Sequence, residues 1–306
     1  MRYVKVLIIP DFSIEKSGIT LRSQQNPCRI LLRNPFGANF AIAKFGIMIL
    51  ALGIIWTKVS FSSDTLTSEE IVRACYARFY YAGNDMKARI LMKLIDKGGQ
   101  ERIRDLTMLR KNDAERGEQK YFIYFHQPSD VKDTTFMVYK YPDRDDDRWL
   151  FIPAINLVKR IAANDKYSSF VGSDFSYEDV SGRKLKEDTY RLLKEEELNG
   201  KGCYCIESLP KGSAEYTKRI SWIDKVSYLP LKEEFYDKQS ELYKRFEAFE
   251  IKDINGIPTA TKRVMKNVKT GHRTEVTLQN TEYNLGIGDD IFSERYLRRP
   301  PAEWIK

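Results

Sequence analysis

The stretch "LYKRFEAFEIKDINGIPTATKRVMKNV", residues 242–268, decides the fold class. Two strand-like runs flank Asn255-Gly256, and Asn-Gly between such runs is the strongest short-range signal for a β-hairpin. Similar reversals stand at Gly98-Gly99, Asn199-Gly200 and Thr270-Gly271. Repeated along the chain, this pattern predicts about eleven strands in an ordered meander. An antiparallel sheet of that size bends strongly and curls towards a barrel.

The strands carry bulky apolar residues on both faces. In "KYFIYFH", residues 120–126, alternation places Tyr121, Ile123 and Phe125 on one face and Phe122 and Tyr124 on the other. A sheet with one face in water would show polar residues on that face. We therefore expect both faces to be covered, one by helices and the rest by a ligand or partner.

Two segments are predicted to be helical. Thr67 and Glu70 have capping-box spacing at the start of a helix over 67–82, and Leu66 can pack against Ile71. The segment around 170–182 is the second candidate, because "SYED", residues 176–179, has the same spacing.

The net charge of +8 does not predict nucleic-acid binding, because the excess lies at the N-terminus. Residues 1–62 carry eight basic and two acidic side chains, which leaves 43 basic and 41 acidic side chains for residues 63–306. The main domain is therefore nearly neutral, and electrostatic attraction to phosphate has no strong basis in it.

The first 62 residues are predicted to be an N-terminal extension and a signal peptide. Lys44 precedes an apolar core at 45–56, which is shorter than the roughly 20 residues of a bilayer span. Small residues follow at Ser60 and Ser62, which suits cleavage after Ser62. The alternative is an uncleaved segment that anchors the chain to the inner membrane. Residues 63–306 would then form the exported domain in the periplasm.

No constellation of residues predicts catalysis or metal binding. Ser173 in "VGSDF" resembles a nucleophile elbow, but the motif lacks the second glycine, so a role of Ser173 or Ser176 as a helix cap is favoured. The acidic run at 143–147 lacks the glycine and distal glutamate of a calcium loop, which favours a solvated turn. Cys203 and Cys205 are expected to be buried hydrophobic residues rather than a disulfide. We expect no enzyme activity, no metal and no cofactor.

Several motifs resemble one known family. "WIDKVSYLPLKEEFYD" (222–237) resembles the strand-turn-strand unit of periplasmic lipoprotein carriers and related anti-sigma-factor regulators. "DDDRWLFIPAINLVKRI" (145–161) and "SSFVGSDFSYEDV" (168–180) resemble the central signature of the outer-membrane lipoprotein-sorting (LolA-like) proteins. "GIPTATKRVMKNVKTGHRTEV" (256–276) and "DDIFSERYLRR" (289–299) resemble its C-terminal signature. The resemblance covers about residues 66–299.

The resemblance implies an α+β, mainly antiparallel fold: an unclosed half β-barrel with a helical lid over an apolar cavity. It also implies a monomeric, non-enzymatic periplasmic carrier of a lipoprotein or lipid cargo. This branch is similar to proteins that act beside exporters of the resistance-nodulation-division (RND) type, which makes such an exporter a candidate partner. The alternative is a periplasmic sensor or accessory subunit that uses the same fold to bind a partner protein.

Within this fold, "RWLFIPAINLVKRI" (148–161) is expected to form a strand and the start of its partner. The residues expected to line the apolar cavity and lid are Met92, Phe122, Phe136, Trp149, Phe151, Phe170 and Phe175. Met86, Met108 and Met137 would add adaptable contacts.

Overall fold

The computed structural model describes residues 66–305 of the 306 in the chain. The predictions for residues 1–62, including the signal peptide, the alternative membrane anchor and the boundary after residue 62, lie outside this part. Across the described residues, no helix has both the length and the apolar composition needed to cross a bilayer.

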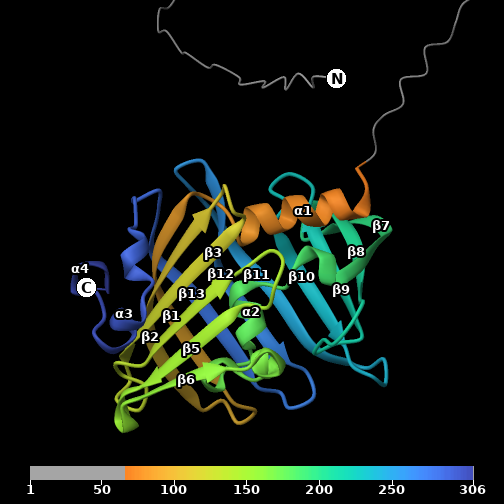
Figure 1. The fold of residues 1–306 in the computed structure, drawn as a ribbon. Coiled ribbons are helices and arrows are strands. Elements are labelled where there is room, and N and C mark those ends of the chain that lie inside the picture. Colours follow the sequence, from red (N-terminus) through yellow and green to blue (C-terminus); the bar gives the residue numbers. More distant parts are fainter. Residues whose placement is uncertain (1–65, 306) are drawn as a thin grey trace, which may run out of the picture. The chain divides into compact units, whose positions relative to one another are not determined.

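A single antiparallel sheet of 13 strands forms the framework (Figure 1). The strands are β1 (Asp85–Ile95), β2 (Glu101–Asp113), β3 (Glu118–Gln127), β4 (Thr135–Lys140), β5 (Asp147–Ile152), β6 (Leu157–Ile161), β7 (Asp188–Leu198), β8 (Lys201–Pro210), β9 (Lys218–Asp224), β10 (Pro230–Tyr236), β11 (Leu242–Ile254), β12 (Ile257–Asn267) and β13 (Arg273–Tyr283). Their spatial order is β6-β5-β4-β3-β2-β1-β13-β12-β11-β10-β9-β8-β7. The predicted hairpins are confirmed, and the sheet has two strands more than the eleven expected.

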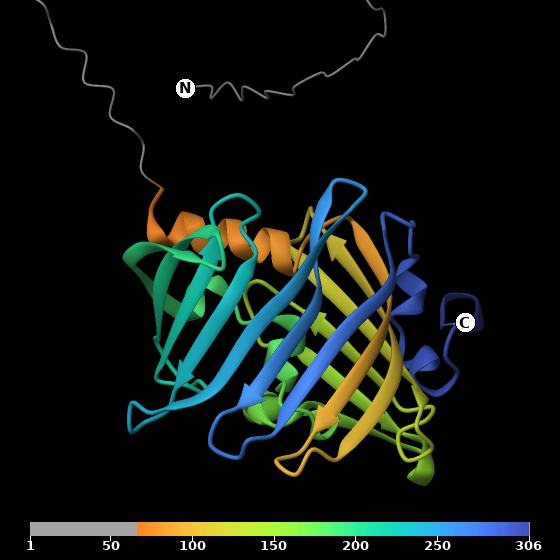
Figure 2. The same cartoon turned by 180° about the vertical axis from the view of Figure 1, so that it is seen from behind.

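The sheet consists of two meanders joined in the middle. Within each meander, neighbours in the chain are neighbours in space, and the join is the pairing of β1 with β13. Figure 2 shows this join, where the orange β1 lies beside the blue C-terminal strands. The outermost strands, β6 and β7, form no pair with each other, so the barrel is unclosed.

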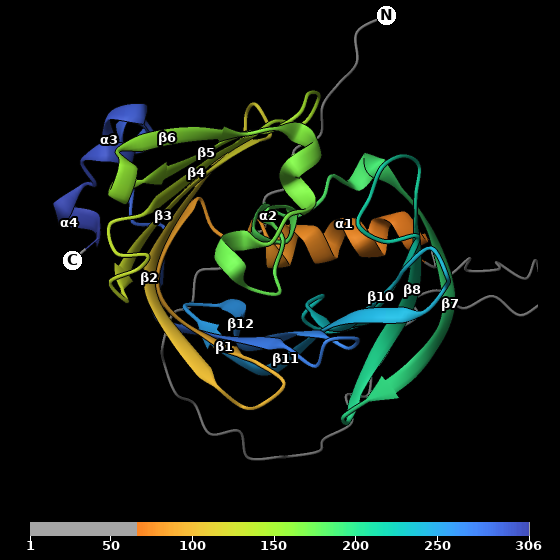
Figure 3. The same ribbon diagram turned by 90° about the horizontal axis from the view of Figure 1, so that it is seen from below.

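Helices α1 (Ser68–Phe79) and α2 (Tyr177–Ser181) lie on the concave side of the curved sheet (Figure 3). Helix α1 crosses the hollow, and the connection from β6 to β7 contains α2 with the short 3-10 turns η2 (Ala163–Tyr167), η3 (Phe170–Gly172) and η4 (Leu185–Glu187). We call this connection, residues 162–187, the lid segment. An unclosed, mainly antiparallel α+β fold is thus confirmed.

Both helix starts follow their local sequence. Thr67 caps α1, and the Glu70 carboxylate accepts the Thr67 backbone N–H at 2.8 Å, which completes the predicted capping box. The Ser176 hydroxyl accepts the Asp179 N–H at 3.2 Å, so the second capping box is also confirmed. Ile71, Val72 and Cys75 bury one face of α1 against Ile206 and Ile223 of the sheet.

The two faces of β3 separate as the alternation predicts. Tyr121, Ile123 and Phe125 join the cluster on the concave face, which includes Phe170 of the lid segment. Phe122 and Tyr124 join a second cluster on the opposite face of the sheet.

The cover of that second face is neither a ligand nor a partner. It is the chain's own C-terminal segment, residues 287–305, which contains η5 (Asp289–Ile291), α3 (Glu294–Arg298) and α4 (Ala302–Ile305). Ile291, Phe292 and Leu297 pack there, and the Thr135 hydroxyl donates to the Leu297 carbonyl at 2.7 Å. The expectation of an external cover is therefore wrong for this face.

A buried carboxylate fixes the path into the C-terminal segment. Asp85, only 3% exposed, accepts the backbone N–H groups of Leu285, Gly286 and Ile287 at 2.6, 2.8 and 2.9 Å. Hydrogen bonds to an ionised acceptor are stronger than those between neutral groups. The turn after β13 is therefore tied firmly to the first residue of β1.

Candidate functional site

A cavity lies between the concave face of the sheet, helix α1 and the lid segment. The sheet contributes mainly apolar side chains from β1, β2, β3, β12 and β13, and the lid segment contributes Phe170, Phe175, Asp179 and Val180. The space between the wall atoms is about 870 Å³, including the part that opens to solvent. The walls stand close together across much of this space.

The walls are built from adaptable side chains. Met86, Met92 and Met108 contribute three thioethers, and Ile90, Leu106 and Leu278 contribute branched aliphatic groups. Methionine has a flexible, polarizable side chain that fills irregular space. The cavity can therefore fit an apolar group without a single required shape.

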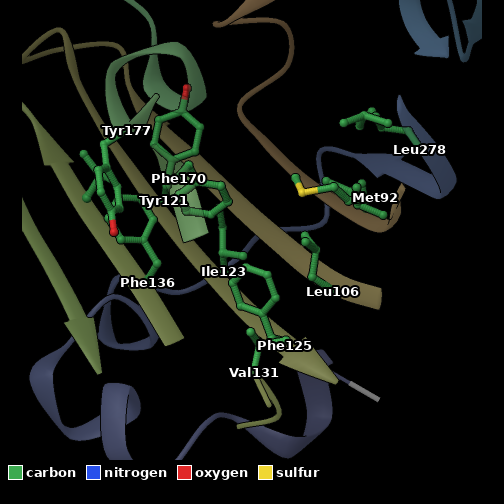
Figure 4. Packing of buried hydrophobic residues seen from close by; sticks show 14 of the residues in the cluster. Met92, Leu106, Tyr121, Ile123, Phe125, Val131, Phe136, Phe170, Tyr177 and Leu278 are labelled. Atoms are coloured by element: carbon green, nitrogen blue, oxygen red, sulfur yellow. The ribbon is translucent and has the colours of Figure 1, made fainter. Parts of the chain in front are cut away.

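Three of the seven predicted site residues line this cavity. Met92 contributes from β1, and Phe170 and Phe175 contribute from the lid segment. Phe136 lies just behind them, with its ring centroid 5.3 Å from that of Phe170. Figure 4 shows Phe170 among Tyr121, Ile123, Phe136 and Tyr177. Contact of these residues with a ligand stays a prediction.

The other three residues lie away from the cavity. Phe122, Trp149 and Phe151 pack in the cluster with the C-terminal segment, on the opposite face of the sheet. Met137 lies in the same cluster. The alternation of "RWLFI" is as predicted, with Leu150 on the concave face, but Trp149 and Phe151 point to the other face. The physical reason is that the C-terminal segment needs a bulky apolar surface to pack on.

The tip of the lid segment is held to the sheet by polar contacts around Asp174. Its carboxylate accepts the hydroxyl proton of Thr274 at 2.7 Å and lies 2.6 Å from Nδ1 of His272. The Asp174 backbone N–H donates to the Thr274 hydroxyl at 3.0 Å. We call Asp174, His272 and Thr274 the lid latch.

Helix α2 is fixed by charged side chains from the sheet. Lys244 donates to Asp179 and to Glu215, both at 2.8 Å. Lys140 donates to the carbonyls of Ser181 and Gly182 at 2.6 and 2.7 Å, which satisfies the end of the helix. Burial lowers the pKa of Lys140 to about 8. Closure of the lid therefore depends on specific hydrogen bonds as well as on apolar packing.

Two arginines point into the same apolar space, and the sequence analysis missed both. Arg110 of β2 is 3% exposed, and Arg263 of β12 is half-buried. Burial lowers the pKa of each guanidinium. The alternation of the strands contained the signal, because Arg110 shares a face with Leu106 and Met108.

The residues considered for catalysis or metal binding are engaged in hydrogen bonds, ion pairs or apolar packing within the fold. The Ser173 hydroxyl donates to the Phe170 carbonyl at 2.8 Å within the lid segment, and Ser176 is the residue that caps the start of α2, as one of the two predicted possibilities. In the acidic run, Asp146 is buried and pairs with Arg148 at 2.7 Å, so this turn is only partly solvated.

Cys203 and Cys205 are free and buried, which confirms their assignment as hydrophobic residues. Burial raises the pKa of the Cys203 thiol to about 11. Within residues 66–305, no three His, Cys, Asp or Glu side chains gather to hold a metal.

Comparisons with known proteins agree with this architecture. A family model described as that of an uncharacterized protein matches residues 117–299. The crystal structure of a putative outer membrane lipoprotein-sorting protein domain from Vibrio parahaemolyticus is 31% identical, with a TM-score of 0.71, and the match covers 76% of this chain and 98% of that one. A DUF1329 family protein from Desulfovibrio piger is 30% identical, with a TM-score of 0.69, and the match covers 74% of this chain and 95% of that one.

A more distant likeness concerns the fold alone. A LolA superfamily protein from Nitrosomonas europaea is 17% identical, with a TM-score of 0.60, and the match covers 76% of this chain and all of that one. No curated protein sequence matches the chain. The two structures at 30% identity or more nevertheless match over nearly their whole length. The chain therefore belongs to the DUF1329 family, and it is similar over most of its length to a putative outer membrane lipoprotein-sorting protein domain, as the motifs in its sequence indicated.

Proposed function

We propose that the protein is a non-enzymatic periplasmic carrier that binds a lipidated or lipid-like cargo in the cavity beneath the lid segment. The observation that carries this proposal is the lining of the cavity, where methionine, aliphatic and aromatic side chains of the sheet face Phe170 and Phe175 of the lid segment. The relative from Vibrio parahaemolyticus, described as a lipoprotein-sorting protein domain, supports the same class of function.

The energetics of transfer explain why such a cargo needs a carrier. Each methylene moved out of water contributes about 0.8 kcal/mol, so a chain of about 15 methylenes contributes on the order of 12 kcal/mol. A single acyl chain therefore does not cross an aqueous compartment unshielded. A wide apolar lining with few polar anchors shields it and still allows release.

The size of the cavity implies that the lid segment moves when cargo enters. The space of about 870 Å³ between the wall atoms includes a part that opens to solvent, and the wall side chains stand close together across the rest. A long acyl chain fits only when Phe170 and Phe175 withdraw from the sheet. The contacts of the lid latch and of Lys244 then set the free energy of opening.

Transport towards the outer membrane, beside an RND-type exporter, is the finer part of the proposal. It is supported by the resemblance of the central and C-terminal motifs to sorting proteins and by the similarity to the putative sorting domain from Vibrio parahaemolyticus. Membership of the same family supports a location in the periplasm. The predicted signal peptide would bring the chain there.

Native mass spectrometry tests the proposal. The protein is expressed with its N-terminal segment and purified from the periplasm without detergent. We expect extra mass that disappears on organic extraction, and renewed uptake of lipid by the extracted protein. A clean mass, no uptake and a stoichiometric protein partner would favour the partner-binding sensor instead.

A matched pair of variants links uptake to the cavity. Ala260 is 4% exposed and lines the cavity, so Ala260→Leu adds three carbon atoms to the space that cargo would occupy. Ala114 lies exposed in the β2–β3 turn, and Ala114→Leu is the control. We expect lipid uptake to fall only in Ala260→Leu. Equal uptake by both variants would place the lipid elsewhere on the protein.

A further inference from the structure

Arg110 and Arg263, two of the three arginines that line the cavity, have no carboxylate partner in the described structure. Among residues 66–305, the guanidinium of Arg110 makes one hydrogen bond, from Nη2 to the Ala82 carbonyl, and its Nε has none. The Arg263 guanidinium lies over the ring of Phe79, 5.2 Å from the centroid. The two cations lie close enough for Arg110 to lower the pKa of Arg263, which desolvation has already lowered.

Nearby carboxylates are engaged by other groups. Asp179 is the one carboxylate among the described lining residues, and it accepts from Lys244 at 2.8 Å and from the Ser176 N–H at 2.7 Å. Asp85, a weak influence on Arg110, accepts three backbone N–H groups of the turn after β13. The charge of the two guanidiniums is therefore not compensated within the described structure.

Uncharged groups complete the surroundings of the two arginines. The phenol of Tyr121 lies near both cations, and burial raises its pKa, so it stays neutral. The Tyr283 hydroxyl lies 2.9 Å from that of Thr259, and both residues line the cavity. The Tyr121 hydroxyl donates to the Gln119 side chain at 2.7 Å and the Thr259 hydroxyl to the Ile257 carbonyl at 3.0 Å, which leaves the Tyr283 hydroxyl as the donor that can turn to an anion. None of the three hydroxyls carries a negative charge. A cationic site therefore stands at one end of an apolar cavity.

We infer that the cavity binds an anionic amphiphile, whose carboxylate or phosphate is held by Arg110 and Arg263 and whose alkyl chain lies along Met86, Met92 and Met108. This inference rests on the proposed carrier function and narrows its cargo class. Burying a charge without a partner is costly, and a planar guanidinium matches a carboxylate or phosphate through paired hydrogen bonds. A cargo with an uncharged lipid group would leave both cations uncompensated.

The test compares ligands that share one alkyl chain. Laurate, dodecyl phosphate and methyl laurate displace a neutral fluorescent dye, N-phenyl-1-naphthylamine, from the purified protein. We expect the two anions to bind at least about tenfold more tightly than the neutral ester. Inorganic phosphate should not displace the dye, because it lacks the apolar chain.

Variants assign the preference to the two arginines. Arg110→Gln and Arg263→Gln should each bring the affinity for anions close to that for methyl laurate, while binding of methyl laurate is kept. Arg263→Lys should retain part of the preference, because it keeps the charge. Arg116→Gln is the control, since Arg116 is an exposed side chain of the β2–β3 turn. Arg263 is half-buried, so its variants remain informative if Arg110→Gln fails to fold.

The outcomes separate this inference from the function on which it rests. Equal binding of the anions and the ester by the wild type would overturn the inference and leave the carrier function standing. So would a glutamine variant that loses binding of the anions and of the ester alike. Displacement of the dye by inorganic phosphate would mean that a free anion, not an amphiphile, is recognised, which also overturns it. Failure of all three alkyl ligands to bind would overturn the carrier function and the inference together.

Discussion

Replacing Thr274 by valine should open the lid segment without unfolding the sheet. The Thr274 side chain is fully buried, and its hydroxyl makes both hydrogen bonds that tie Thr274 to Asp174. Valine has nearly the same shape but makes neither bond. The substitution therefore removes the latch with little change in packing.

The size of the effect follows from the two bonds lost. A hydrogen bond to a charged group contributes about 1.5–3 kcal/mol, and one between neutral groups about 0.5–1.5 kcal/mol. Asp174 keeps its contact with His272, so we take the low end of the sum, about 2 kcal/mol. Since about 1.4 kcal/mol is a factor of ten, the open population should rise roughly 30-fold.

Amide hydrogen exchange measures this population directly. The informative amides are those of Phe170, Ser173 and Gly182, whose N–H groups donate within the lid segment at 2.7, 3.0 and 2.7 Å. Their exchange should accelerate about 30-fold in Thr274→Val, while strand amides keep their rates. Thr277→Val is the control, because Thr277 lies on the opposite face of the same strand. Unchanged exchange at these amides, or equal acceleration over the whole chain, would refute the latch.

Two further predictions concern pH and the C-terminal segment. Burial lowers the pKa of Lys140 to about 8 from an ordinary value near 10.5. At a pH between these two values the unfolded chain binds more protons than the folded chain, so the free energy of unfolding rises with pH. Relative to Lys140→Met, the wild type should gain about 2 kcal/mol of unfolding free energy between pH 7.5 and 9.5 in urea titrations, and a constant difference would contradict the assigned shift. Phe292→Ala removes a side chain of the C-terminal segment that is 1% exposed against the sheet and should cost about 3–5 kcal/mol in the same assay. Phe249→Ala, at a side chain 66% exposed, is its control and should cost less than about 0.5 kcal/mol, so similar losses would argue against the packing role.

Local features were predictable from the sequence because a few neighbouring residues determine them. The capping boxes at Thr67 and Ser176 need only a hydroxyl and an acid three residues later. The hairpin at Asn255-Gly256 needs only two residues that accept positive φ. The division of Tyr121 and Phe122 between two faces follows from the period of a strand.

The faces that line the cavity were not predictable in the same way. Alternation shows that Trp149 and Leu150 point in opposite directions, but only long-range packing decides which direction is inward. The segment that occupies the outer face begins more than a hundred residues later, at Ile287. Ile291, Phe292 and Leu297 carried the signal, because apolar side chains that follow a last strand need a surface to cover. Arg110 and Arg263 were missed because basic residues in strands are usually solvated.

The pairing of β1 with β13 determines when the cavity comes into existence. Each meander forms from hairpins between consecutive strands, whereas Met86 pairs with Tyr283 roughly two hundred residues later, and closing so long a loop is slow. The cavity wall takes Met86 and Met92 from one half and Val276 and Leu278 from the other. An incomplete chain therefore has no enclosed hollow, and it presents the apolar residues of its future wall to water until the final strand arrives.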